Sequence, residues 1–142
     1  MPENRKPYNY TQKHNSQDNS SVEKSLYRGY YSWYKTPYRY GGESKRGVDC
    51  SFLVKSIYRS EFDIRLPRTT KEQVKIGYWV DKKELKAGDL VFFKTSYSSR
   101  HVGIYLHDDK FINASTKYGV VLSSLNNSYW RSHYWKAKRI LN

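Results

Sequence analysis

The spacing of apolar residues changes near the middle of the chain, and this change limits the choice of folds more than any other feature. In the first half, apolar residues recur every three or four positions, as on one face of a helix. In the second half they fall in short runs of the kind that form buried strands. Helices followed by neighbouring strands predict an α+β domain, with the helices packed on an antiparallel sheet.

Three helices are predicted in the first half. The first contains Val22, Leu26, Tyr30 and Trp33 on one face, and it ends before Pro37. The second follows Cys50 and has a face of apolar and small residues, namely Phe52, Leu53, Ser56, Ile57 and Ser60. The third is short: Thr69 or Thr70 caps it, it runs through Gln73 and Ile76, and Gly77 closes it.

Five apolar segments predict strands in the second half. They follow the turn at residues 86–89 and comprise residues 90–93, 101–106, 110–115, 120–122 and 137–141. His107, Asp108 and Asp109 supply the turn of a hairpin between the second and third of these strands. The sequence has no internal repeat, no nucleotide-binding glycine motif and no apolar stretch long enough to cross a membrane.

Residues 1–21 are almost entirely polar and cannot bury enough apolar surface to offset the entropy lost on ordering. We therefore expect a disordered tether over residues 1–21 and one folded domain over residues 22–142. The N-terminus lacks the hydrophobic segment of a secretion signal, so no signal peptide is expected in this sequence.

Basic residues outnumber acidic ones, with 26 lysines and arginines against 13 aspartates and glutamates, which gives a formal net charge of +13. Such a charge suits an anionic partner: nucleic acid, a membrane surface or an acidic cell-wall polymer. Because the charge is spread along the chain, it does not choose among these three partners.

The stretch Gly47–Val54 contains the only cysteine of the sequence. Asp49 is placed to cap the helix that follows, so Cys50 falls in the first helical turn. There the free backbone N–H groups and the helix dipole lower the pKa of a thiol, and a thiolate is a competent nucleophile. The alternative is a buried cysteine that acts only as a small hydrophobe. A single cysteine forms no internal disulfide, so cysteine usage does not tell whether the protein works in an oxidising or a reducing compartment.

A cysteine nucleophile needs a base beside it, and four histidines are available. His14 lies in the polar N-terminal segment and His107 in a turn, and we expect both to face solvent. His133 follows an aromatic, basic segment, where we expect it to pack or cap. His101 begins a strand after a loop rich in serine, a position from which a side chain can face a cleft. The histidines and the cysteine are not at the spacing of metal ligands.

Asn113 lies on the strand expected to pair with that of His101, which makes it a candidate third group. With a two-residue turn at residues 108–109, Asn113 would oppose Ile104, so a longer turn or a bulge is needed to bring it to His101. Its carbonyl oxygen could then accept a hydrogen bond from the imidazole. The alternative for Asn113 is an asparagine of a turn or a sheet edge, and the alternative for His101 is a histidine at a strand end without a partner.

Six segments occur in an order that resembles the NlpC/P60 cysteine peptidases. They are Tyr38–Gly42, Val48–Ser51, Leu66–Thr70, Ala87–Phe93, His101–Tyr105 and Phe111–Ser115. Within that family the chain is most similar to the NlpC-type lipoproteins that cut the cell wall, over about residues 36–141. The resemblance implies a papain-like α+β fold and hydrolysis of amide bonds in peptidoglycan stem peptides or cross-links. It also implies that Cys50 is the nucleophile, His101 the base and Asn113 the residue that orients the base.

The resemblance further assigns substrate-binding positions. Tyr38 resembles a tyrosine whose hydroxyl borders the oxyanion site, and Asp49 and Ser51 resemble residues that shape recognition of the substrate's amine end. Two positions depart from the family pattern. Phe52 stands where relatives usually have glycine, and we expect its ring to point into the core. Asn113 stands where close relatives often have histidine.

The sequence thus predicts a monomeric cysteine peptidase that acts on peptidoglycan peptides, without cofactor, metal or nucleic acid. By resemblance it belongs in the cell envelope, either in the periplasm or at the outer membrane as a lipoprotein. A lipid anchor is implied only by the resemblance, because no lipidated cysteine precedes the polar segment in this sequence. One alternative is a non-catalytic wall-binding module of the same fold, which Phe52 favours. Another is a nucleic-acid binder, which the charge and the tyrosines favour.

Overall fold

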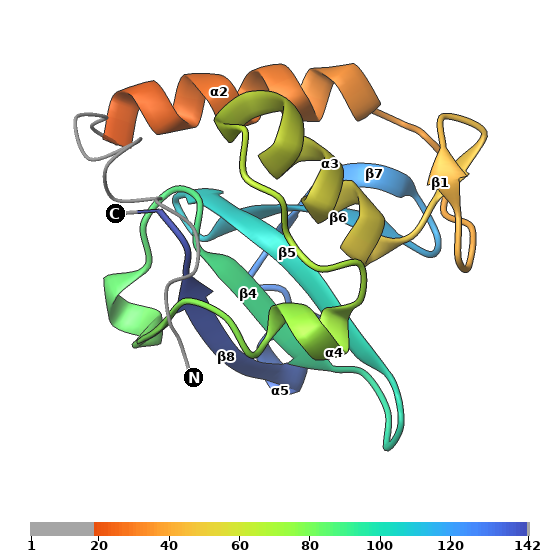
Figure 1. The fold of residues 1–142 in the computed structure, drawn as a ribbon. Coiled ribbons are helices and arrows are strands. Elements are labelled where there is room, and N and C mark those ends of the chain that lie inside the picture. The colour runs from red at the N-terminus through yellow and green to blue at the C-terminus, as the bar shows by residue number, and fades with distance from the viewer. Residues whose placement is uncertain (1–18, 142) are drawn as a thin grey trace.

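In the computed structural model, which describes residues 19–141, a six-stranded antiparallel sheet separates two helical layers of unequal size (Figure 1). The strand order is β3-β8-β4-β5-β6-β7. Helices α2 (Asn19–Trp33) and α3 (Cys50–Phe62) cover one face of the sheet. The short helix α5 (Ser128–His133) packs on the other face. The predicted α+β arrangement is confirmed.

All five predicted strands are present in the sheet, together with one that the apolar spacing did not predict. The strands are β3 (Tyr78–Val80), β4 (Leu90–Lys94), β5 (Arg100–His107), β6 (Lys110–Ser115), β7 (Gly119–Ser124) and β8 (Tyr134–Arg139). Strands β1 (Glu43–Ser44) and β2 (Gly47–Val48) form a small separate hairpin before α3. The predicted third helix is α4 (Thr70–Gln73), capped by Thr69, but it ends at Gln73 and does not reach the predicted Ile76. The 3-10 helix η2 (Lys82–Glu84) precedes β4.

Helix α2 begins at Asn19, three residues before the expected start at Val22. Residues 19–21 therefore lie in its first turn, and residues 1–18 of the predicted tether lie outside the described residues. Gly29 lets α2 approach α3 closely, because a Cβ atom there would lie 2.8 Å from the Ile57 side chain. Within residues 19–141, no helix combines the length and apolarity needed to cross a membrane.

The face that α3 buries is shifted from the predicted one and shares Leu53 and Ile57 with it. Its buried apolar side chains after the first turn are Leu53, Val54, Ile57, Tyr58 and Phe62. Phe52 is only half-buried, and its ring packs against Trp33 at a centroid distance of 6.4 Å and under the guanidinium of Arg68 at 5.2 Å. The prediction that Phe52 points into the core is therefore wrong. Because α3 lies between α2 and the sheet, its buried stripe is centred on Leu53 and Ile57, and Phe52 falls at the margin.

The hairpin of β5 and β6 contains the feature that positions the site. Asp108 and Asp109 form the two-residue turn, and both have positive φ, at 51° and 63°. A bulge between Tyr105 and His107 then shifts the pairing of the two strands. Beyond the bulge, each residue of β6 faces a residue of β5 one position earlier than in an unbroken hairpin.

The face of the sheet that α5 covers has a second, smaller core. Its buried members are Val80, Val91, Phe93, Tyr105, Phe111, Leu125 and Ala137. Trp130 of α5 packs against this cluster, in contact with the rings of Phe93 and Phe111. One indole therefore anchors a helix that is too short and too polar for its periodicity to reveal it.

Candidate active site

Cys50 is the first residue of α3, and the local sequence explains why the helix starts there. Asp49 has an extended backbone, and its carboxylate accepts a hydrogen bond from the Phe52 N–H at 2.8 Å, which is the predicted N-cap. Strand β2 ends at Val48, so the chain passes almost directly from strand to helix. The Cys50 thiol, 8% exposed, thus lies where backbone N–H groups and the helix dipole stabilise an anion.

His101 and Asn113 meet diagonally across two strands. Because of the bulge, Asn113 lies opposite Gly103 and not opposite the expected Ile104, and His101 is two residues away on the same face of β5. Gly103 leaves room for this contact, since a Cβ atom there would lie 2.7 Å from the Phe111 ring and 3.3 Å from Cβ of Asn113. Nε2 of His101 is 2.9 Å from Oδ1 of Asn113.

The Asn113 side chain is held in one orientation by β7. Its Nδ2 donates to the carbonyl of Val121 at 3.3 Å and to the hydroxyl of Ser123 at 2.9 Å. The side chain is fully buried, so its amide oxygen is directed at His101 as an acceptor. The imidazole then donates from Nε2, which leaves Nδ1 for the Cys50 thiol.

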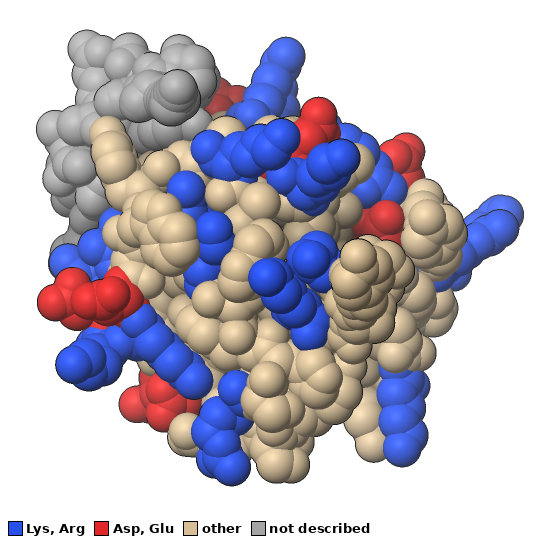
Figure 2. All heavy atoms as spheres, turned by 90° about the horizontal axis from the view of Figure 1, so that it is seen from below, with Lys and Arg blue, Asp and Glu red and all other residues tan. Residues whose placement is uncertain are grey.

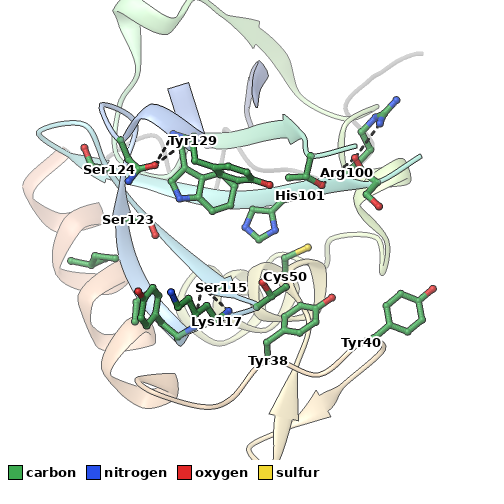
Figure 3. Close-up of a pocket in the computed structure, with 18 of the residues that line it drawn as sticks. Tyr38, Tyr40, Cys50, Arg100, His101, Ser115, Lys117, Ser123, Ser124 and Tyr129 are labelled. Atoms are coloured by element: carbon green, nitrogen blue, oxygen red, sulfur yellow. Dashed lines mark hydrogen bonds between the residues drawn. The ribbon is translucent and has the colours of Figure 1, made fainter. Parts of the chain in front are cut away.

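The side chains of Cys50 and His101 lie side by side (Figure 3), and each changes the proton affinity of the other. Burial acts to raise the pKa of Cys50, but the hydrogen bond and charge of His101, with help from the Val102 N–H and the Thr70 hydroxyl, lower this pKa below its ordinary value. Burial acts to lower the pKa of His101, but the hydrogen bond and charge of Cys50 and the hydrogen bond of Asn113 raise it. Both directions favour a thiolate paired with an imidazolium.

A tryptophan covers the His101 ring. The ring centroids of Trp130 and His101 are 4.9 Å apart, and their planes are inclined by 23°. Trp130 is itself held by Phe93 and Phe111, at centroid distances of 4.8 and 5.6 Å. Since the face of an indole attracts a cation, this stack favours the charged imidazole and keeps it in place.

These side chains open into a cleft between α3, the β6–β7 turn and α5 (Figure 3). Tyr38, predicted to border the oxyanion site, lines the cleft together with Cys50. Burial, and then the negative charge of Cys50, raise the pKa of Tyr38, so its hydroxyl keeps the proton it could donate. The cations that line the cleft are Lys35, Arg100 and Lys117, and no aspartate or glutamate of the described chain lines it.

Asp49 and Ser51, the other predicted substrate-binding residues, do not line this cleft. The guanidinium of Arg68 donates to the two carboxylate oxygens of Asp49 at 3.2 and 3.0 Å and to the Ser51 hydroxyl at 3.0 Å. Arg68 also donates to Glu43 at 2.6 Å. Both residues thus face a cation of their own chain. Direct contact of either one with a substrate amine stays a prediction.

The remaining histidines lie away from Cys50 or outside the described residues. His107 was expected to face solvent, but its Nε2 is hydrogen-bonded to the Tyr27 hydroxyl at 2.7 Å, which ties the end of β5 to α2. Nδ1 of His133 donates to the carbonyl of Tyr129 at 2.7 Å, within the last turn of α5. His14 lies outside the described residues. Within residues 19–141, no group of three or more histidine, cysteine or carboxylate side chains is arranged to hold a metal ion.

Sequence reasoning missed three residues that support the site, namely Arg68, Ser123 and Trp130. Arg68 stands in the Leu66–Thr70 segment, which drew attention for its order along the chain and not for its charge. Ser123 was beyond the end of the predicted strand 120–122, and the structure extends β7 to Ser124. No signal pointed to Trp130, because α5 itself was not predicted.

Comparison of the sequence with family models and curated proteins gives one consistent set of relatives. The model described as the NlpC/P60 family matches residues 35–139. Over 111 residues the chain is 55% identical to "Probable endopeptidase NlpC" of Escherichia coli, an alignment that covers 77% of this chain and 72% of the relative. Over 124 residues it is 41% identical to "Murein DD-endopeptidase MepS/Murein LD-carboxypeptidase" of the same species, with 87% and 66% covered.

Solved structures give the same result. An NlpC/P60 family protein from Bacillus cereus superimposes with a TM-score of 0.76 at 31% identity, over 85% of this chain and 40% of that protein. A protein from Staphylococcus aureus described as similar to a lipoprotein of the NLP/P60 family gives a TM-score of 0.77 at 29% identity, over 89% and 43%. The shared region is thus nearly all of the described chain but less than half of either solved protein.

Proposed function

The chain belongs to the NlpC/P60 family, and on this premise we propose that it is a peptidoglycan endopeptidase, a cysteine peptidase that cuts amide bonds in stem peptides or their cross-links. The names of its relatives support both parts of this function, since one is named a probable endopeptidase and another a murein DD-endopeptidase. Cys50 and His101 line the cleft, and Asn113 is hydrogen-bonded to His101 in the core beside it; this arrangement is the single observation that carries the proposal to particular residues.

In the proposed reaction, the thiolate of Cys50 attacks the carbonyl carbon of the scissile amide, and the carbonyl oxygen takes the negative charge. The N–H of Cys50 and the hydroxyl of Tyr38 are the donors we assign to this oxyanion. The imidazolium of His101 then gives its proton to the nitrogen that leaves as an amine, and an acyl-enzyme thioester remains.

Water completes the cycle. His101, now neutral, takes a proton from a water molecule that attacks the thioester. The Cys50 thiolate then leaves as the carboxylic product departs, which restores the thiolate–imidazolium pair. Asn113 holds the imidazole in one tautomer through both halves of the reaction. Asparagine is never charged, yet it can fulfil this role because the role requires only an acceptor at Oδ1.

A cell-envelope location is consistent with the relative named a murein DD-endopeptidase, because murein is the peptidoglycan of the cell wall. We propose in addition that the protein acts in the periplasm, with a lipid anchor ahead of the polar N-terminal residues. The anchor rests only on resemblance to lipoproteins of the family.

The structure offers little support for the alternative of a non-catalytic wall-binding module. Phe52 was the feature that favoured it, and Phe52 is not among the residues that line the cleft. Its ring packs against Trp33 and Arg68 instead. The cleft therefore reaches Cys50 without obstruction from this side chain.

Digestion of purified muropeptides, with the products identified by mass, tests the function. We expect wild-type protein to release fragments that differ by cleavage of one amide bond. Cys50→Ala and His101→Ala should each abolish this release while the circular dichroism spectrum is unchanged, because nucleophile and base act as a unit. Wild-type turnover by a folded Cys50→Ala protein would remove the thiol mechanism, and no product from wild-type protein would remove the function.

A further inference from the structure

Outside the cleft, the sheet carries a band of cations that lie on two tryptophan rings. This band, called the cationic stripe below, consists of Trp79, Lys94, Arg100, Trp135, Lys136 and Lys138. Its members come from β3, β8, β4 and β5, which are successive neighbours in the sheet. Residues that the sequence spreads over about sixty positions thus form one continuous surface.

The ammonium and guanidinium groups of the stripe are held against the indole faces. Nζ of Lys136 lies 4.2 Å from the ring centroid of Trp79 and 4.6 Å from that of Trp135, so this ammonium contacts both indoles. Trp135 also contacts Lys94 at 4.6 Å and Arg100 at 5.3 Å. All of these distances are within the roughly 6 Å over which a cation is attracted to an aromatic face. The charges are therefore fixed in position before any ligand arrives.

Within residues 19–141, the cations of the stripe form no ion pair with an acidic side chain. Lys138 is 8% exposed, and its burial, followed by the charge of Lys136, lowers its pKa. Like charges held this close repel one another, and a bound anion would relieve that repulsion.

The excess of basic side chains is not confined to the stripe. In the view from below, the side on which β8 lies in Figure 1, lysine and arginine side chains are scattered over the whole face (Figure 2). Aspartate and glutamate side chains are fewer and lie toward its margins. The molecule therefore attracts an anionic polymer over a wider area than the stripe alone.

The stripe also presents an aromatic surface. Trp79 is 67% exposed, so much of its indole surface is open to a ligand. Indoles bind ligands that combine an apolar face with polar edges. A pyranose ring has such a face, and a sugar polymer that also carries carboxylates matches both components of the stripe.

Arg100 joins the stripe to the cleft. It lines the cleft that contains Cys50, and its guanidinium also lies over Trp135. Three backbone carbonyls, those of Ser96, Tyr97 and Ser99, accept hydrogen bonds from its Nη1 and hold it at this junction. A ligand that extends from the cleft past Arg100 therefore comes directly onto the stripe.

We propose that the cationic stripe is a second binding surface, which holds a stretch of anionic peptidoglycan next to the peptide that enters the cleft. Sugar rings of the glycan pack on Trp79, and carboxylates of neighbouring stem peptides pair with Lys94 and Lys136. The proposal rests on the proposed function, because that function supplies the polymer. Nucleic acid, whose bases also stack on aromatic rings, is disfavoured because nothing links it to the cleft.

The test compares two double variants with the same loss of charge. Lys94→Gln with Lys136→Gln removes two cations from the stripe, and Lys24→Gln with Lys110→Gln removes two exposed cations from α2 and the start of β6. Both are made in a Cys50→Ala background, and their binding to purified sacculi is measured by sedimentation over a series of salt concentrations. Trp79→Ala, a change at an exposed position, serves as an independent variant whose folding is not in question.

We expect the stripe variants to bind sacculi about three- to tenfold more weakly than the control at low salt, with a shallower salt dependence. With Cys50 restored, they should cleave a soluble muropeptide at the control rate, because so small a substrate occupies only the cleft. If the stripe variants bound sacculi as tightly as the control, the proposal would be overturned. The same holds if these variants lost only the binding of a single-stranded oligonucleotide. A wild-type protein that leaves the soluble muropeptide intact would instead contradict the proposed function, which the sedimentation assay does not touch.

Discussion

Replacing Asn113 by alanine tests the role of the residue that the hairpin bulge brings to His101. The substitution removes the acceptor at Oδ1, 2.9 Å from Nε2 of His101, and leaves a ring N–H without a partner in a residue that is 8% exposed. It also frees the imidazole to adopt the other tautomer, which would present a proton to Cys50 where the thiol needs an acceptor.

The size of the effect follows from the burial of this N–H. A buried donor that loses its partner costs about 1–3 kcal/mol. If that penalty applies to the orientation in which the His101 ring serves Cys50, kcat falls by about 5- to 150-fold, because roughly 1.4 kcal/mol corresponds to a factor of ten in rate. KM should change little, because Asn113 is fully buried and does not line the cleft.

The assay is muropeptide hydrolysis at several substrate concentrations, with melting temperatures measured on the same samples. Asn113→His should keep much of the activity, since a ring nitrogen can also accept from His101. Ser123→Ala is the matched control: it removes one acceptor of the Asn113 Nδ2–H group but leaves the Oδ1 acceptor for His101 in place, so its loss of kcat should be smaller. A folded Asn113→Ala protein with the kcat of wild type would show that the contact with His101 is only structural.

Three further predictions follow from contacts around Cys50. Because His101 lowers the thiol pKa, iodoacetamide labelling of Cys50 should reach half its maximal rate at a pH below that typical of a free thiol. His101→Ala should raise the pH of this midpoint, and an unchanged midpoint would contradict the pairing of Cys50 with His101. Arg68→Met should lower the melting temperature, and Arg68→Lys should restore only part of it, since lysine cannot bind both oxygens of Asp49; equal stability of Arg68→Lys and wild type would exclude this account. Phe52→Ala should cost about 1 kcal/mol of stability without changing kcat, which a faster Phe52→Ala enzyme would refute.

The parts of the site that the sequence predicted are those that depend on neighbours along the chain. Asp49 before an amphipathic segment predicts a cap and places Cys50 in the first turn by local rules alone, and the structure has this arrangement. The strands of the second half were predicted by their apolar runs for the same reason. The order of motifs along the chain then gave the family.

The parts that the sequence did not predict depend on contacts between distant segments. The register of β5 and β6 was left open because a bulge changes the pairing without changing the apolar pattern. Trp130 was missed because α5 is stabilised by its packing on Phe93 and Phe111 and not by an amphipathic repeat. Phe52 was placed wrongly because a helix packed between two layers, as α3 is, has a wide buried stripe. The centre of that stripe is determined by contacts with α2 and the sheet, which the sequence does not show.

The bulge has a consequence for how proteins of this shape can vary. His101 and Asn113 are 12 positions apart, and the parity of the segment between them decides on which side of the sheet Asn113 emerges. Inserting or deleting one residue there would turn Asn113 toward the opposite core unless a second irregularity absorbed the change. The loop at residues 95–99, by contrast, begins and ends outside this segment, and its length is free of that constraint. We therefore expect natural length variation to collect on the far side of His101, while the hairpin keeps its count.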